Sequence, residues 1–252
     1  ENKLDGGDGD DSLSGGSEQD NIKGGEGDDT IYAGDGDNKL DGGDGNDQIT
    51  SGAGADKLKG GLGDDTLSAG DGNNTADGGD GHDLLSSGSG IAQLNGGNGD
   101  DTLSAGAGDD KLDGGKGDDS LSGGDGTDKI KGGSENDELS GGAGIDKLDG
   151  GTGMDRLEGG AGADLLKGGR DADVFIFAAA EDAGDTISDF KLSDGDLLDI
   201  DGLLQDLGTN LDDALSSGNL SLSDSRAVWL EYDADGEGGE DAFQIAYLKG
   251  VR

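Results

Sequence analysis

The chain has 252 residues, of which 59 are acidic and 17 basic, so its formal net charge is -42; it contains 58 glycines and neither proline nor cysteine. Such a chain repels nucleic acid and anionic membranes, but it attracts cations, above all hard divalent cations such as calcium that prefer carboxylate and carbonyl oxygen. No apolar stretch approaches the roughly 20 residues needed to span a bilayer. We therefore expect calcium as a partner, no nucleic-acid binding and no membrane insertion.

A nine-residue repeat fills the chain from its N-terminus to residue 173. A hydrophobic residue recurs at every ninth position from Leu4 to Phe175, with Ala76 as the one small member. Between these anchors the sequence follows Gly-Gly-x-Gly-x-Asp-x-Leu-x, as in GGDGDDSLS from Gly6 to Ser14. A fixed short period indicates one structural unit stacked on copies of itself. This register argues against the disorder that the composition alone would indicate. The chain begins in mid-repeat, so we expect it to be a fragment of a longer protein.

Each repeat predicts a turn followed by a very short strand. The glycine-rich six residues can adopt the positive-φ turns that side chains disfavour, and the next three residues suffice for a strand. Two repeats then make one coil of 18 residues. Stacked coils, about 4.8 Å apart, form two parallel sheets with the hydrophobic anchors pointing inward. The sequence therefore predicts an all-β solenoid.

The aspartate at the sixth position of each turn is the candidate metal ligand. Successive aspartates on one edge lie eighteen residues apart, so a cation between two coils can contact both carboxylates while turn carbonyl oxygens complete its shell. Simple solvation of an acidic face does not require this register. The predicted aspartate ligands are Asp11, Asp20, Asp29, Asp47, Asp56, Asp65, Asp83, Asp101, Asp110, Asp119, Asp128, Asp137, Asp146, Asp155, Asp164 and Asp173.

Glycines of the turns are the second set of candidate ligands, through their backbone carbonyl oxygens. The alternative, that these glycines only permit the turns, stays open at this point. The predicted positions are Gly6, Gly9, Gly24, Gly27, Gly42, Gly45, Gly60, Gly63, Gly78, Gly81, Gly96, Gly99, Gly114 and Gly117.

The two edges of the predicted solenoid differ in charge. One edge has an unbroken series from Asp11 to Asp173, whereas the other has Asn38, Asn74 and Ala92 at equivalent positions. Loss of a carboxylate lowers the affinity of a site for a hard cation. We therefore expect nearly continuous calcium along the first edge and vacancies around Ala92 on the second.

These repeats resemble the RTX calcium-binding nonapeptide repeats of type I secreted bacterial proteins. The resemblance implies a right-handed parallel β-roll that binds several calcium ions, roughly ten or more by the number of turns. It also implies export by the type I secretion machinery as an unfolded chain, followed by folding outside the cell, where calcium is millimolar. The absence of cysteine fits a secreted or cell-surface protein.

The composition changes at residue 174, where glycine thins out and nearly all the aromatic residues begin. The alternating residues Val174 to Phe177 predict a cap of bulky side chains, which a solenoid needs at its end. The segments Asp185 to Phe190 and Gly195 to Ile200 resemble the stretch that follows the repeats in RTX proteases and adhesins. The part from Ala227 onward resembles the type I secretion target domain of large repeat adhesins.

We therefore predict two domains, a nonapeptide β-roll at residues 1–173 and a β-rich capping and type I secretion target domain at residues 174–252. Within the second, the acidic residues between Asp233 and Asp241 have the spacing of a hairpin loop that could hold a further calcium ion or be a plain acidic turn.

The sequence favours a binding module over an enzyme. His82 is the only histidine and there is no cysteine, so zinc proteolysis, thiol chemistry and Ser-His-Asp hydrolysis lack their residues. We predict a monomeric, non-catalytic module at the secretion end of a large adhesin. One alternative is the non-catalytic C-terminal part of a secreted protease or lipase. Another is an ice- or glycan-binding face, such as the hydroxyl rows that include Ser12, Thr30 and Thr66.

Overall fold

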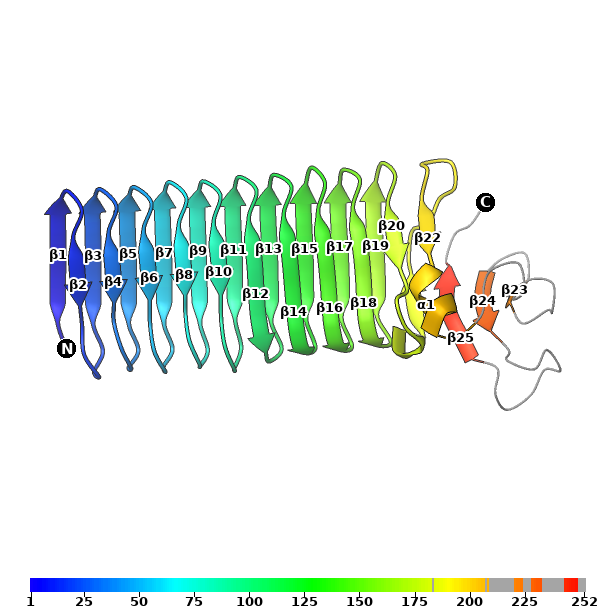
Figure 1. The fold of residues 1–252 in the computed structure, drawn as a ribbon, viewed down its shortest axis with the longest axis horizontal. Helices are drawn as coiled ribbons and strands as arrows, with labels where there is room; N and C mark the ends of the chain where they lie inside the picture. Colours follow the sequence, from blue (N-terminus) through cyan, green and yellow to red (C-terminus); the bar gives the residue numbers. More distant parts are fainter. Residues whose placement is uncertain (183, 207, 209–219, 224–227, 233–242, 249–252) are drawn as a thin grey trace.

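The protein is a parallel β-solenoid of about ten turns, as the computed structural model in Figure 1 shows. The structure describes residues 1–182, 184–206, 208, 220–223, 228–232 and 243–248. The predicted all-β architecture with two parallel sheets is confirmed. The acidic loop between Asp233 and Asp241 lies outside the described residues.

Alternate strands belong to opposite sheets. The larger sheet has 14 strands in the order β1-β3-β5-β7-β9-β11-β13-β15-β17-β19-β21-β25-β24-β23, and the smaller has 11 strands, which are the even-numbered ones from β2 to β22. The strands of the larger sheet are β1 (Lys3–Asp8), β3 (Asn21–Glu26), β5 (Lys39–Asp44), β7 (Lys57–Leu62), β9 (Thr75–Asp80), β11 (Gln93–Asn98), β13 (Lys111–Lys116), β15 (Lys129–Ser134), β17 (Lys147–Thr152), β19 (Leu165–Arg170), β21 (Asp185–Ile187), β25 (Phe243–Leu248), β24 (Val228–Tyr232) and β23 (Leu220–Ser223).

The smaller sheet contains β2 (Ser12–Ser14), β4 (Thr30–Tyr32), β6 (Gln48–Thr50), β8 (Thr66–Ser68), β10 (Leu84–Ser86), β12 (Thr102–Ala107), β14 (Ser120–Gly126), β16 (Glu138–Gly144), β18 (Arg156–Gly162), β20 (Val174–Ile176) and β22 (Leu197–Asp199). Two short helices, η1 (Ala180–Asp182) and α1 (Asp201–Asp206), follow the repeats. None of the helices among the described residues has the length and apolar character needed to cross a membrane.

The register of both sheets explains the period of nine. Each strand pairs in parallel with the strand of the next coil, residue for residue at a distance of 18, as in Leu4 with Ile22 and Leu13 with Ile31. Side chains alternate between the two faces of a strand, so the central residue of each strand points inward. The predicted anchors from Ile22 to Phe175 are buried, with 0–3% of their surface exposed, and the two at the N-terminal end of the stack are half-buried.

Close contact between coils requires glycine at the second position of a turn. Gly25 has a φ of 134°, and a side chain there would overlap the carbonyl oxygen of Gly7 in the preceding coil. The fourth position is similar, since Gly27 has a φ of 116° and its N–H donates to the carbonyl of Asp44, 2.7 Å away. These two glycines are therefore fixed by backbone geometry.

The repeat spacing changes at the C-terminal end of the roll. There β19 pairs with β21 with Leu165 opposite Thr186, and β18 and β20 extend to β22 with Val174 opposite Leu197, so the spacing grows from 18 to 21 and 23 residues. The larger sheet continues through β25, which runs parallel to β21, into antiparallel β24 and β23. The ring of Phe175, fully buried, lies 6.0 Å from that of Phe190.

Candidate metal sites along the two edges

The sixth-position aspartates form a continuous hydrogen-bonded row along the first edge. Each backbone N–H donates to Oδ1 of the aspartate in the next coil, as Asp101 does to Asp119 at 2.8 Å. The row begins at Asp11 and runs through Asp173 to Asp196, with distances of 2.7–3.2 Å. The structure therefore brings the whole predicted first series together on one edge.

The second edge carries an interrupted row. It runs from Asp20 through Asn38 and Asp56 to Asn74, and again from Ala92 to Asp185. Because Ala92 has no side-chain acceptor, the N–H of Asn74 donates instead to the carbonyl oxygen of Ile91, at 3.0 Å. The predicted asymmetry of the two edges thus has a structural counterpart.

The second carboxylate oxygen of these aspartates is buried and lacks a hydrogen-bond partner in the described part of the chain. Burying a carboxylate without a partner is costly, so such an oxygen calls for a cation or a proton. The aspartates with this orphaned Oδ2 are Asp11, Asp20, Asp29, Asp47, Asp56, Asp65, Asp83, Asp101, Asp110, Asp119, Asp128, Asp137, Asp146, Asp155, Asp164 and Asp185. All but Asp185 belong to the predicted ligands, and the remaining predicted ligand, Asp173, is buried as well.

The first glycine of each turn leaves space beside this orphaned oxygen. A methyl group on Gly78 would meet Oδ2 of Asp83 from its own turn and, 2.7 Å away, the carbonyl oxygen of Gly96 from the next coil. A carboxylate oxygen and a carbonyl oxygen therefore converge on one point. The first-position glycines whose carbonyl oxygens face such points include Gly24, Gly42, Gly78, Gly96 and Gly114 of the predicted set.

Asn38 shows which further carbonyl oxygens face the sixth-position side chain. Its amide nitrogen donates to the carbonyl oxygens of Gly34, at 3.1 Å, and of Gly36, at 2.8 Å. The second- and fourth-position carbonyls of this turn therefore point at the place where a cation would sit beside an aspartate. The fourth-position glycines of the prediction have φ between 96° and 137°; they are Gly9, Gly27, Gly45, Gly63, Gly81, Gly99 and Gly117.

Burial makes the charged form of these carboxylates unfavourable. It raises the pKa of Asp65, Asp101, Asp137 and Asp173 to about 7, and the negative charge of neighbouring aspartates adds to the effect. A divalent cation would reverse this cost, because it favours the ionised form. The donor set, carboxylate and carbonyl oxygen only, is the one that calcium prefers.

No group of three or more His, Cys, Asp or Glu side chains converges on a single point within the described residues. Each candidate site has at most two carboxylates, one per coil, with the remaining oxygens from the backbone. The sites are therefore distributed along the stack and depend on pairing between coils.

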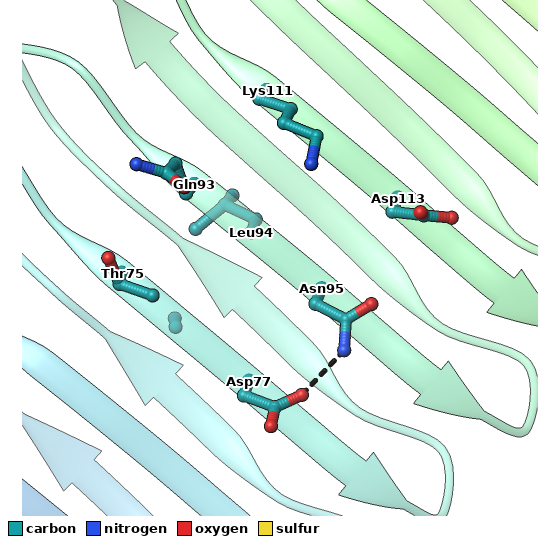
Figure 2. A pocket seen from close by; sticks show the side chains of 8 residues that line it. Thr75, Asp77, Gln93, Leu94, Asn95, Lys111 and Asp113 are labelled. Atoms are coloured by element: carbon teal, nitrogen blue, oxygen red, sulfur yellow. Dashed lines mark hydrogen bonds between the residues drawn. The ribbon is translucent and has the colours of Figure 1, made fainter.

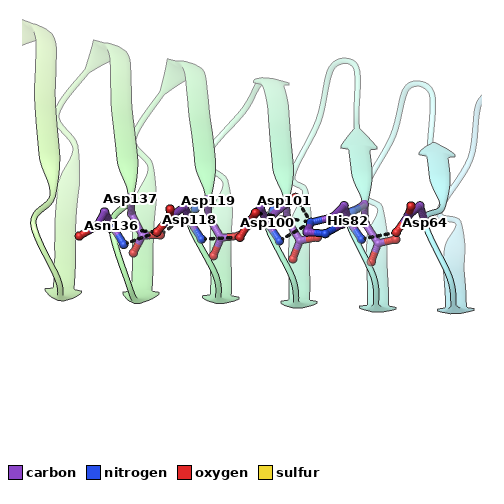
Figure 3. A network of polar contacts seen from close by, with 9 residues as sticks. Asp64, His82, Asp100, Asp101, Asp118, Asp119, Asn136 and Asp137 are labelled. Carbon is purple, nitrogen blue, oxygen red and sulfur yellow. Dashed lines mark hydrogen bonds and ion pairs between the residues drawn. The ribbon is translucent and has the colours of Figure 1, made fainter.

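A second row of hydrogen bonds runs along the fifth position of the first edge, in the opposite sense (Figure 3). Here each side chain accepts from the backbone N–H of the next coil, as Asp64 Oδ1 does from His82 and Asp100 Oδ1 does from Asp118. The histidine continues the row, because its Nδ1 accepts the N–H of Asp100 at 2.8 Å. The lone histidine therefore replaces an aspartate as a structural acceptor.

The outer face of the larger sheet is a charged surface with a shallow pocket over β9, β11 and β13 (Figure 2). Its polar groups pair with one another: Asn95 donates to Asp77 at 2.6 Å, and Lys131 contacts Asp113 at 2.9 Å. These exposed pairs between neighbouring strands contribute little individually.

Asp185 and Asp196 are the candidate residues that the nonapeptide register does not reveal. Each extends one row of aspartates beyond the repeats, through the N–H groups of Asp164 and Asp173 respectively. A signal does exist, since both precede a hydrophobic residue by two positions, as every repeat aspartate does. Their spacing of 21 and 23 residues hides that signal from a search at period nine.

Two rows of oxygen sites on a stack of glycine-rich turns define a metal-binding β-solenoid. The chain belongs to the family of the RTX calcium-binding nonapeptide repeat, whose model matches residues 1–22, 14–49, 23–58, 50–85, 59–94, 86–121, 95–130, 113–148 and 149–182. These repeats bind calcium, and the residues present fit that ion.

One similar solved structure is the solution structure of the AlgE6R3 subunit from the Azotobacter vinelandii mannuronan C5-epimerase. The identity is 33%, the match covers 51% of this chain and 73% of that chain, and the TM-score is 0.38. Among curated proteins, none matches the chain.

Proposed function

We propose that this chain is a calcium-driven folding module at the secretion end of a large adhesin exported by a bacterial type I system. In this proposal, residues 1–173 form the calcium-binding roll, and residues 174–252 cap it and carry the export signal. The module is monomeric, acts outside the cell or at its surface, and has no catalytic role of its own.

The orphaned carboxylate oxygens are the observation that carries this proposal. Sixteen buried Oδ2 atoms lie in two rows without a hydrogen-bond partner in the described region. Together with a net charge of -42, they make the calcium-free fold electrostatically unfavourable. Because each ion joins two coils, binding free energy becomes folding free energy.

The folding part is tested with the purified chain, dialysed against chelator and titrated with calcium. We expect circular dichroism to change cooperatively from coil to β structure, and small-angle X-ray scattering to show strong compaction, at millimolar calcium. Magnesium is the matched control, since its octahedral geometry and tightly held water disfavour such a cage. A compact β structure in excess chelator at neutral pH would contradict the proposal.

The export part is tested by fusing the chain to a passenger and co-expressing a type I exporter. We expect the passenger in the medium with the full chain, and in the cytosol when residues 174–252 are removed. Export that is equally efficient without these residues would refute the assignment of the signal.

A further inference from the structure

Asp185, outside the repeats, is the most deeply buried acidic residue at the C-terminal end of the roll. It begins β21, is 0% exposed, and its Oδ1 accepts the backbone N–H of Asp164 at 2.8 Å. This bond has the geometry of the sixth-position row, although 21 residues separate the partners. The matched repeats end at residue 182, so Asp185 belongs to none of them.

The free oxygens of Asp164 and Asp185 converge on one empty place beside Gly159. A methyl group on that glycine would lie 2.5 Å from Oδ2 of Asp164 and 2.8 Å from Oδ2 of Asp185. Both oxygens are buried and have no hydrogen-bond partner in the described region. One coil earlier, the equivalent place at Gly141 faces one carboxylate oxygen, from Asp146, and the carbonyl oxygen of Gly159. A second carboxylate thus replaces a carbonyl at the end of the row.

The surroundings of this pair are negative. Burial and then the nearby charge of Asp164 raise the pKa of Asp185, and the charge of Asp182 adds to the increase. Asp182 is itself buried, where its Oδ2 accepts the N–H groups of Ala178 and Ala179. None of the ion pairs in the described part of the chain includes these three aspartates. Two carboxylates in such a place require a cation or a shared proton.

We propose that Asp164 and Asp185 hold a terminal calcium ion that fastens the post-repeat segment to the last coils of the roll. This rests on the calcium-binding role of the repeats. The strand that begins at Asp185 pairs with β19 on one side and with β25 on the other. An ion at its first residue therefore links the roll to the C-terminal strands through a single short strand.

Native mass spectrometry of the full chain in calcium tests the site by counting bound ions. Asp185→Asn keeps an oxygen that can accept the N–H of Asp164 but removes the charge, and we expect it to bind one calcium ion fewer than the wild type. The matched control is Asp182→Asn, which removes the same charge from the same neighbourhood and should leave the count unchanged. Hydrogen exchange should be faster in β21 and β25 of Asp185→Asn and unchanged in β9, which reports that the roll is intact.

An unchanged ion count in Asp185→Asn would overturn the inference and leave the pair sharing a proton. An equal loss in Asp182→Asn would also overturn it, because the effect would then come from overall charge. A wild-type chain that binds no calcium would instead refute the function of the repeats themselves, so the two failures are distinguishable.

Discussion

The side-chain amide nitrogen of Asn38 lies 2.8 Å from the carbonyl oxygen of Gly36 and donates a hydrogen bond to it. Asn74 makes the corresponding bond to Gly70, at 3.0 Å. At an aspartate turn such a carbonyl oxygen would face a cation, whereas here an N–H group satisfies it. The middle of the second edge is therefore held together by hydrogen bonds that need no metal.

The first prediction concerns the distribution of calcium over the two edges. A crystal structure with calcium, analysed by anomalous scattering, should show nearly continuous ions along the edge from Asp11 to Asp173. On the other edge the positions on both sides of the Ala92 turn should be vacant, because Ala92 offers no side-chain oxygen. Fully occupied ions with ordinary coordination distances beside Ala92 would refute the prediction.

Restoring one carboxylate should restore metal binding on the second edge. Asn38→Asp replaces the donating amide by an acceptor between Asp20 and Asp56, and we expect native mass spectrometry to find at least one further calcium ion. The control Asn46→Asp adds the same charge at an exposed fifth position, where the side chain accepts the N–H of Asp64. It should leave the count unchanged, and a gain in both variants would mean that charge alone decides.

Acid should partly replace calcium. The pKa of Asp65 and Asp101 is raised from 3.8 to about 7, chiefly by burial, so between these values the folded calcium-free chain holds more protons than the unfolded chain. Its free energy of unfolding is therefore highest below about pH 4 and falls as the pH rises through about 7. Circular dichroism in chelator should show more β structure at about pH 5 than at about pH 8. Equal or greater structure at the higher pH would contradict this expectation.

The end of the stack should matter more than its middle. Phe175→Ala removes a fully buried ring that faces Phe190, at a cost of about 3 to 5 kcal/mol, and it opens the end of the core. The matched control is Leu103→Ala, at a buried anchor with intact coils on both sides. We expect the calcium concentration at the folding midpoint to rise more in Phe175→Ala. A larger increase for Leu103→Ala would show that the aromatic cap does not control folding.

Most of the roll follows from the period of the sequence, because each coil contacts only its neighbours and repeats their geometry. The buried anchors and the aspartate rows were predictable for this reason. The choice of Oδ2 as the free oxygen was not, since it depends on which oxygen accepts the N–H of the preceding coil. The pairing of β21 with β25 was hidden as well, because it joins residues almost 60 positions apart that share no period, such as Asp185 and Ala246.

The constant offset of 18 between paired residues restricts how the length of this protein can change. Inserting a single residue within the roll would exchange inward and outward side chains on one side of the insertion. Removing 18 consecutive residues would instead join two equivalent positions and leave both aspartate rows in register. The roll can thus be lengthened or shortened only by whole coils, up to the segment where Thr186 and Leu197 pair at spacings of 21 and 23 and growth by copying ends.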